Sequence, residues 1–251
     1  AAFFIPGIAC FLLGVGFVLF TKASVKGKNE ATSAVEDAPV SVNTTRLALG
    51  LMAVTALSVG LITQAYTSGL PKVFDDTMQT LVANFTLDRE GGLTMSSGLV
   101  TLVILAGAVG QIVGGSLASK YSPKAVYICM FAIMIPLALL ASQLNGVALV
   151  AVAAVMMLAI TGCLPAENCI IVRFCPENWR ARVFSAKFVI ALGGGSFAVL
   201  AVGEIFNQTT DFTWFYGFLI GLAVVVMAFA AFLPSMKNSV EGAAPVSGSA
   251  E

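Results

Sequence analysis

The chain has 251 residues, of which 58% are hydrophobic and 10% are charged, and its 13 basic and 13 acidic side chains cancel. Soluble domains carry about 25% charged residues, so this chain cannot cover a water-exposed surface and is predicted to be an all-α membrane protein. A neutral chain without a basic run is not expected to bind nucleic acid. The absence of histidine removes the commonest metal ligand and the usual proton shuttle.

Seven apolar segments are long enough to cross a bilayer as helices, which predicts a bundle of seven transmembrane spans. The segments are residues 1–20, 47–66, 97–117, 125–141, 147–172, 183–206 and 212–233. The first one opens without a methionine or a basic leader, so we expect it to be the last helix of a missing N-terminal half. A polar linker at 21–45 then precedes a six-helix domain at 46–234, and a small, polar tail follows at 235–251.

The basic residues are unevenly divided between the two sides that this topology predicts. If the linker is cytoplasmic, eleven of the 13 basic residues lie on the cytoplasmic side, and only Lys72 and Arg89 lie outside. Because cytoplasmic loops of membrane proteins are enriched in lysine and arginine, the linker and the C-terminus are predicted to be cytoplasmic. The expected location is a plasma (inner) membrane that the chain crosses several times.

Glu167 and Lys187 interrupt the fifth and sixth apolar segments at similar depths from the inner loop that joins them. Glu167 lies six residues before Arg173, which is about 9 Å along a helix. One interpretation is a structural salt bridge near the inner interface, with Lys187 extending towards water. The other is a gate or coupling carboxylate whose partner changes between states. The candidates for gating or coupling are Glu167, Lys187, Arg173, Arg180 and Arg182.

The third segment carries a row of glycines at helical spacing, Gly107, Gly110 and Gly114, which predicts a tight helix–helix seam. The sequence GGSLASKYSPKAV follows from position 114 and resembles the inner-loop motif of the major facilitator superfamily. The positions that match this motif in kind are Gly114, Gly115, Ala118, Lys120 and Lys124. Ser119 stands where the family usually has aspartate.

A second stretch is similar to the tenth span, the following loop and the start of the eleventh span of bacterial members of that superfamily. The residues concerned are Pro165, Glu167, Asn168, Arg173, Pro176, Trp179, Arg180, Arg182, Phe184 and Lys187. The chain thus resembles spans six to twelve of a twelve-span transporter. The resemblance implies two inverted three-helix repeats after Arg46 and a small-solute cavity between the two halves. The partners that the resemblance implies are the lipid bilayer, a small-molecule substrate, and protons or another coupling ion.

Polar side chains on the helices that would line this cavity are candidates for substrate contact. They are Gln64, Tyr66, Gln111 and Asn168. Gln64 and Gln111 are favoured because an amide that faces lipid leaves its hydrogen-bonding groups unsatisfied. Hydrogen bonds between helices are an equally good explanation of both amides.

The resemblance and the composition together predict secondary active transport by alternating access, with symport and antiport both left open. A seven-helix receptor or photoreceptor is the alternative. Retinal proteins need a lysine near the middle of their last helix, and residues 212–233 contain none. Neither a phosphate-binding loop nor a nucleophile–base constellation is present, so no enzyme activity, cofactor or metal is expected.

Overall fold

The computed structural model describes residues 7–8, 11–16, 19, 42–77, 89–209 and 212–233. Within them it has six long α-helices and one short 3₁₀ turn, and no strand. The elements are α2 (Val42–Thr77), α4 (Arg89–Lys120), α5 (Pro123–Ala141), α6 (Gly146–Phe174), η1 (Glu177–Trp179), α7 (Arg180–Gln208) and α8 (Thr213–Ala231). The predicted all-α fold is therefore confirmed for these residues.

Each of the six long helices contains a stretch long and apolar enough to cross a membrane. These helices correspond to the second through seventh predicted spans. The first predicted span lies largely outside the described residues, which are helical at 7–8 and 11–16. The tail and most of the predicted linker also lie outside them, except that α2 already begins at Val42. Residues 1–40 form a unit of their own.

Two helices extend well beyond the predicted spans, because hydropathy marks the apolar part of a helix and not its ends. The second span was expected to end at residue 66, yet α2 continues through Pro71 to Thr77. Leu70, Val73 and Phe74 are buried there, so packing against the bundle continues past the apolar run. Proline removes one backbone donor but is tolerated in a membrane helix whose neighbours compensate for it. The other extended helix is α4, which starts at Arg89 instead of residue 97.

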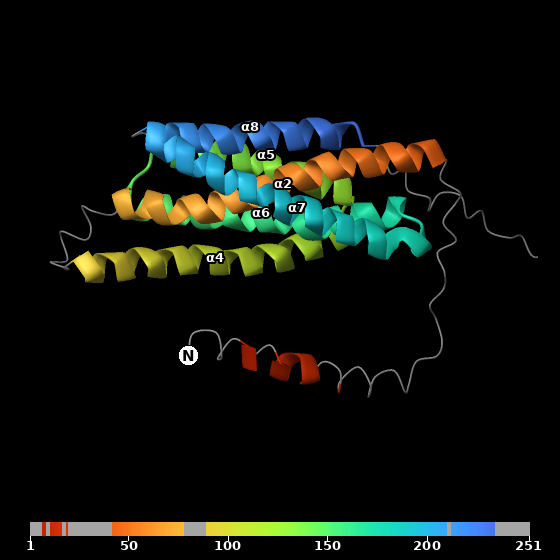
Figure 1. Ribbon diagram of the computed structural model, residues 1–251, viewed down its shortest axis with the longest axis horizontal. Helices are drawn as coiled ribbons and strands as arrows, with labels where there is room; N and C mark the ends of the chain where they lie inside the picture. Colours follow the sequence, from red (N-terminus) through yellow and green to blue (C-terminus); the bar gives the residue numbers. More distant parts are fainter. Residues whose placement is uncertain are drawn as a thin grey trace, which may run out of the picture. The chain divides into compact units, whose positions relative to one another are not determined.

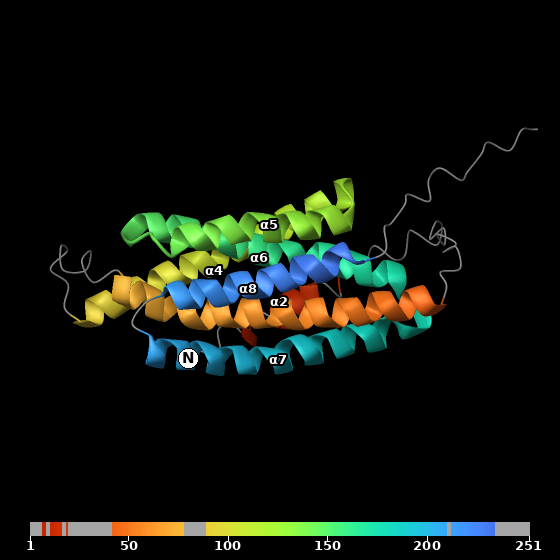
Figure 2. The same cartoon turned by 90° about the horizontal axis from the view of Figure 1, so that it is seen from above.

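The long helices run side by side in one bundle (Figures 1 and 2). α6 packs against both α4 and α5, and α2 packs against both α7 and α8. α5 and α8 also contact each other and so connect the two groups. α6 and α7 lie on either side of the η1 loop, at which Arg173, Glu177, Arg180 and Arg182 are found.

The α4–α6 seam is the tight contact that the glycine row predicted. A Cβ atom at Gly114 would overlap the backbone of Gly162, and one at Gly110 would overlap the backbone of Leu158. Across the same seam the Thr161 hydroxyl donates a hydrogen bond of 2.7 Å to Gly107 O. Small side chains let the two backbones approach closely, which is how helices gain packing energy in lipid.

Candidate functional site

The centre of the candidate site is an ion pair between α6 and α7. Lys187 Nζ lies 3.0 Å from Glu167 Oε2 and donates a hydrogen bond of 2.6 Å to Asn168 Oδ1. Glu167 is completely buried and Lys187 is 8% exposed. α6 and α7 are joined by the short η1 loop and run antiparallel, so residues at equal distances from the loop lie at the same depth. Glu167 and Lys187 are such residues, and the structure shows them in contact.

The carboxylate of Glu167 is poorly compensated. Among the described residues, neither of its oxygens has a partner in hydrogen-bonding geometry, although Oε2 is within 3.0 Å of Lys187 Nζ. The attraction is therefore a close charge contact, while the directed hydrogen bond of the ammonium goes to Asn168. A buried charge needs both opposite charge and hydrogen bonds to offset its loss of hydration. Glu167 has the first and lacks the second.

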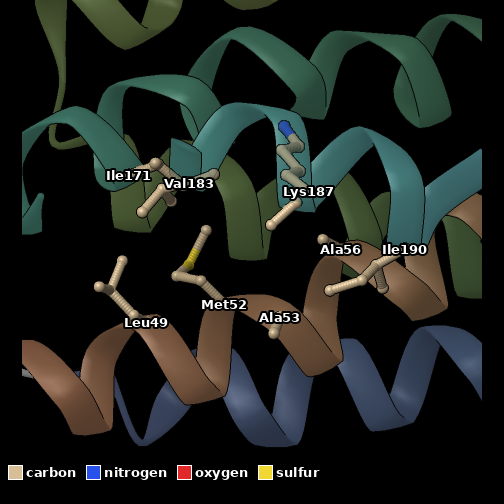
Figure 3. A pocket seen from close by; sticks show the side chains of 9 residues that line it. Leu49, Met52, Ala53, Ala56, Ile171, Val183, Lys187 and Ile190 are labelled. Atoms are coloured by element: carbon tan, nitrogen blue, oxygen red, sulfur yellow. The ribbon is translucent and has the colours of Figure 1, made fainter. Parts of the chain in front are cut away.

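An apolar pocket of about 160 Å³ lies beside the stem of Lys187, between α2, α6 and α7. Its lining residues are Leu49, Met52, Ala53, Ala56, Ile171, Val183, Ala186, Lys187 and Ile190. Figure 3 shows the amine nitrogen of Lys187 pointing away from Leu49 and Met52 of α2. The lysine thus presents carbon to the pocket and charge to α6, and the pocket leaves its stem room to change conformation.

The three arginines of the inner loop lie nearer the surface than this pair. Arg180 pairs with Glu177 at 3.4 Å, and the guanidinium of Arg182 lies over the Trp179 ring, 5.5 Å from its centroid. Arg173 is exposed in the last turn of α6. The three arginines give the end of the α6–α7 hairpin a basic surface.

The residues of the inner-loop motif have different structural roles. Gly114 forms the α4–α6 seam, Gly115 faces Pro165, Ala118 is buried and Lys120 is exposed. Lys124 donates hydrogen bonds to Ala231 O and Leu233 O, which are carbonyls at the end of α8. A lysine at a helix C-terminus satisfies free carbonyls and interacts favourably with the helix dipole. The sequence did not predict this link to the last helix.

The structure does not bring the four predicted substrate-contact residues together. Tyr66 is completely buried, and its hydroxyl donates a hydrogen bond of 2.8 Å to Ala153 O of α6. Gln64 is half-buried against Gly195 of α7, Gln111 is exposed on α4, and Asn168 accepts from Lys187. Tyr66 and Asn168 therefore already hold neighbouring helices in this conformation.

Tyr127 of α5 is a buried polar residue near Glu167 that the sequence did not single out. It lies in an apolar run without any motif around it, and only the rotation of α5 turns it inward. Its hydroxyl has no hydrogen-bond partner among the described residues. In that part of the chain there is also no group of three or more cysteine or acidic side chains that could hold a metal ion.

A bundle of six helices that can each cross a bilayer, with an ion pair buried among them, defines an integral multi-pass membrane protein. Residues 74–248 match the family model of the Major Facilitator Superfamily. This match covers more than half of the chain, which therefore belongs to that superfamily and is a membrane transporter. Members of the superfamily are transporters rather than enzymes. No match was found among curated proteins.

Proposed function

We propose that the chain is the C-terminal part, spans six to twelve, of a secondary active transporter that moves a small solute by alternating access. Protons or another ion drive the movement, and the Glu167–Lys187 pair controls it from the inner side. The missing N-terminal half of the same protein would supply the other wall of the substrate cavity. Gln64 and Gln111 are the amides we assign to substrate contact, because the family resemblance makes α2 a wall of that cavity and α4 a helix that flanks it.

The observation that supports this function best is the buried ion pair between α6 and α7. A carboxyl group that alternates between an ammonium group and an apolar environment changes its proton affinity by orders of magnitude. Glu167 has a lysine at 3.0 Å on one side, and an apolar pocket lies beside the stem of that lysine. Breaking the pair would remove a direct ionic link between α7 and α6, and protonation of Glu167 would make that step less costly.

The proposal places the pair on the cytoplasmic side of a plasma membrane. The linker, the α6–α7 loop and the C-terminal tail would then face the cytoplasm, as the distribution of basic residues favours. A fluorescent protein fused after Glu251 tests this sidedness, because it matures in the cytoplasm and stays dark when it is exported through the general secretory pathway. A dark fusion in otherwise well-expressed, inserted protein would reverse the proposed orientation.

The experiment that tests the coupling role uses the full-length protein in proteoliposomes. After a screen of small solutes has identified one that is taken up, uptake is measured over a range of pH for Glu167→Gln. We expect this variant to lose the pH dependence and at least ten-fold in rate, because a neutral amide cannot exchange a proton.

Glu204→Gln is the matched control. Glu204 is exposed on α7, far along the helix from Lys187, and its Oε1 accepts from Gln208. We expect uptake and its pH dependence to stay as in the wild type. Unchanged rate and pH dependence in Glu167→Gln would exclude the coupling role.

A further inference from the structure

Tyr127 presents a polar group in the middle of the bundle without an obvious purpose. The residue is completely buried, and its hydroxyl lacks a hydrogen-bond partner among the described residues. Its ring is fixed by an edge-to-face contact with Phe131, at a centroid distance of 5.4 Å. A buried hydroxyl without a partner is unfavourable, and phenylalanine would fill the same space without that cost. The hydroxyl therefore needs an explanation.

The geometry of the α5–α6 hairpin puts this hydroxyl at the level of Glu167. A Cβ atom at Gly162 would lie 3.5 Å from Sδ and Cε of Met130, so these two residues face each other. Because the helices are antiparallel, Tyr127, one turn before Met130, lies level with the residues about one turn after Gly162. Tyr127 and Glu167 are indeed close enough to interact electrostatically.

The other neighbours each donate a hydrogen bond elsewhere. Thr55 of α2 lies close enough to the Tyr127 hydroxyl to interact with it, and its own O–H donates to Met52 O at 3.0 Å. The Cys163 thiol donates to Ile160 O at 3.0 Å. Lys187 directs its hydrogen bond to Asn168.

The titratable groups that interact with Glu167 in the described part of the chain are thus Tyr127 of α5, Cys163 of α6 and Lys187 of α7. Among these three groups, Tyr127 is the one whose hydroxyl makes no hydrogen bond that meets strict geometric criteria in the described part of the chain. Glu167 in turn has one oxygen, Oε1, without a polar partner among the described residues, while Oε2 lies 3.0 Å from Lys187 Nζ.

We propose that Tyr127 is the second partner of Glu167. Its hydroxyl forms a hydrogen bond with the carboxyl group of Glu167 when that group is protonated and has separated from Lys187. A tyrosine hydroxyl suits this role because it both donates to a carbonyl oxygen and accepts from a carboxyl O–H. The proton on Glu167 comes from the aqueous phase, and none is transferred from Tyr127. In this conformation Lys187 holds Oε2 of Glu167 at 3.0 Å, and Oε1 and the Tyr127 hydroxyl have no mutual hydrogen bond. The inference rests on the proposed coupling role of Glu167.

Infrared spectroscopy of the full-length protein in lipid tests the inference, with protons as the only ligand. A pH titration yields the C=O stretching band of protonated carboxyl groups, and its loss in Glu167→Gln assigns the contribution of Glu167. In Tyr127→Phe we expect this contribution to shift to higher frequency, because the carbonyl oxygen loses a hydrogen bond. The substitution removes one hydroxyl and leaves the ring in place, so the elution profile of the protein should be unchanged.

Tyr216→Phe is the matched control. Tyr216 of α8 is also buried with a hydroxyl that lacks a partner among the described residues, but Glu167 is not among the groups that act on it. Its substitution should leave the Glu167 band in place. A band at the wild-type position in Tyr127→Phe would overturn the inference and leave the coupling role standing. A protein without any Glu167 band, even in acid, would contradict the coupling role and the inference with it.

Discussion

At the scale of residues, the Glu167–Lys187 pair is a costly arrangement. Both groups are at least nine-tenths buried, and the carboxylate has no polar partner besides Lys187 among the described residues. A pair with such incomplete compensation contributes little to net stability, but removing one partner leaves an uncompensated charge in an apolar place. A protein that needed only stability at this position would be served by two apolar side chains.

This reasoning predicts how the folded protein responds to neutralisation of the pair. Lys187→Met strands the carboxylate of Glu167 and should destabilise the protein by about 3–5 kcal/mol. The double variant Glu167→Gln with Lys187→Met carries no charge at the site and should regain stability to within ~1 kcal/mol of the wild type. The stability of both variants is measured by thermal unfolding in detergent, with size-exclusion chromatography as the readout of the folded fraction. Equal destabilisation of the single and the double variant would mean that charge is not what the pair contributes.

The sequence was sufficient to select Glu167 and Lys187 and to predict their similar depth, because a charged residue stands out in an apolar segment. It did not predict the hydrogen bond of Lys187 to Asn168, the capping of α8 by Lys124, or Tyr127. Each of these depends on which way a helix is rotated about its axis. In segments that are apolar on all sides no periodic pattern reveals that rotation.

At the scale of elements, hydropathy was sufficient to locate the helices but not to predict where they begin and end. The cores of α5, α6, α7 and α8 fall within a few residues of the predicted spans. The long extensions of α2 and α4 consist of residues with mixed polarity, which continue a helix by packing and backbone hydrogen bonds. The glycine row, by contrast, predicted the correct kind of contact, because spacing of small residues is a geometric signal.

The α4–α6 seam predicts opposite effects for two glycine substitutions in the same helix. Gly114→Ala puts a methyl group against the backbone of Gly162 and should cost about 1–3 kcal/mol, because the helices must separate. Gly98→Ala has open space around it and should be neutral or slightly stabilising, since alanine is the better helix former. Unfolding of both variants in detergent gives the comparison. Equal stability of the two would show that the seam is loose.

At the scale of the whole molecule, six membrane-spanning helices and the family match make the chain a transporter of the Major Facilitator Superfamily. Composition predicted a helical membrane protein, because lipid restricts a chain to few architectures, and the resemblance of two sequence stretches to the superfamily predicted the transporter. Substrate choice could not be predicted in the same way. The cavity of such a transporter is built by two halves, and the candidate amides Gln64 and Gln111 are on separate helices, α2 and α4.

The most direct test of the account is transport by the neutral double variant, Glu167→Gln with Lys187→Met, in proteoliposomes. If the pair were only a structural salt bridge, a variant that folds as well as the wild type should transport as well. The account predicts instead that the double variant, once shown to fold, has lost the pH dependence of uptake together with at least ten-fold in rate. Uptake with the wild-type rate and the wild-type pH profile would contradict it.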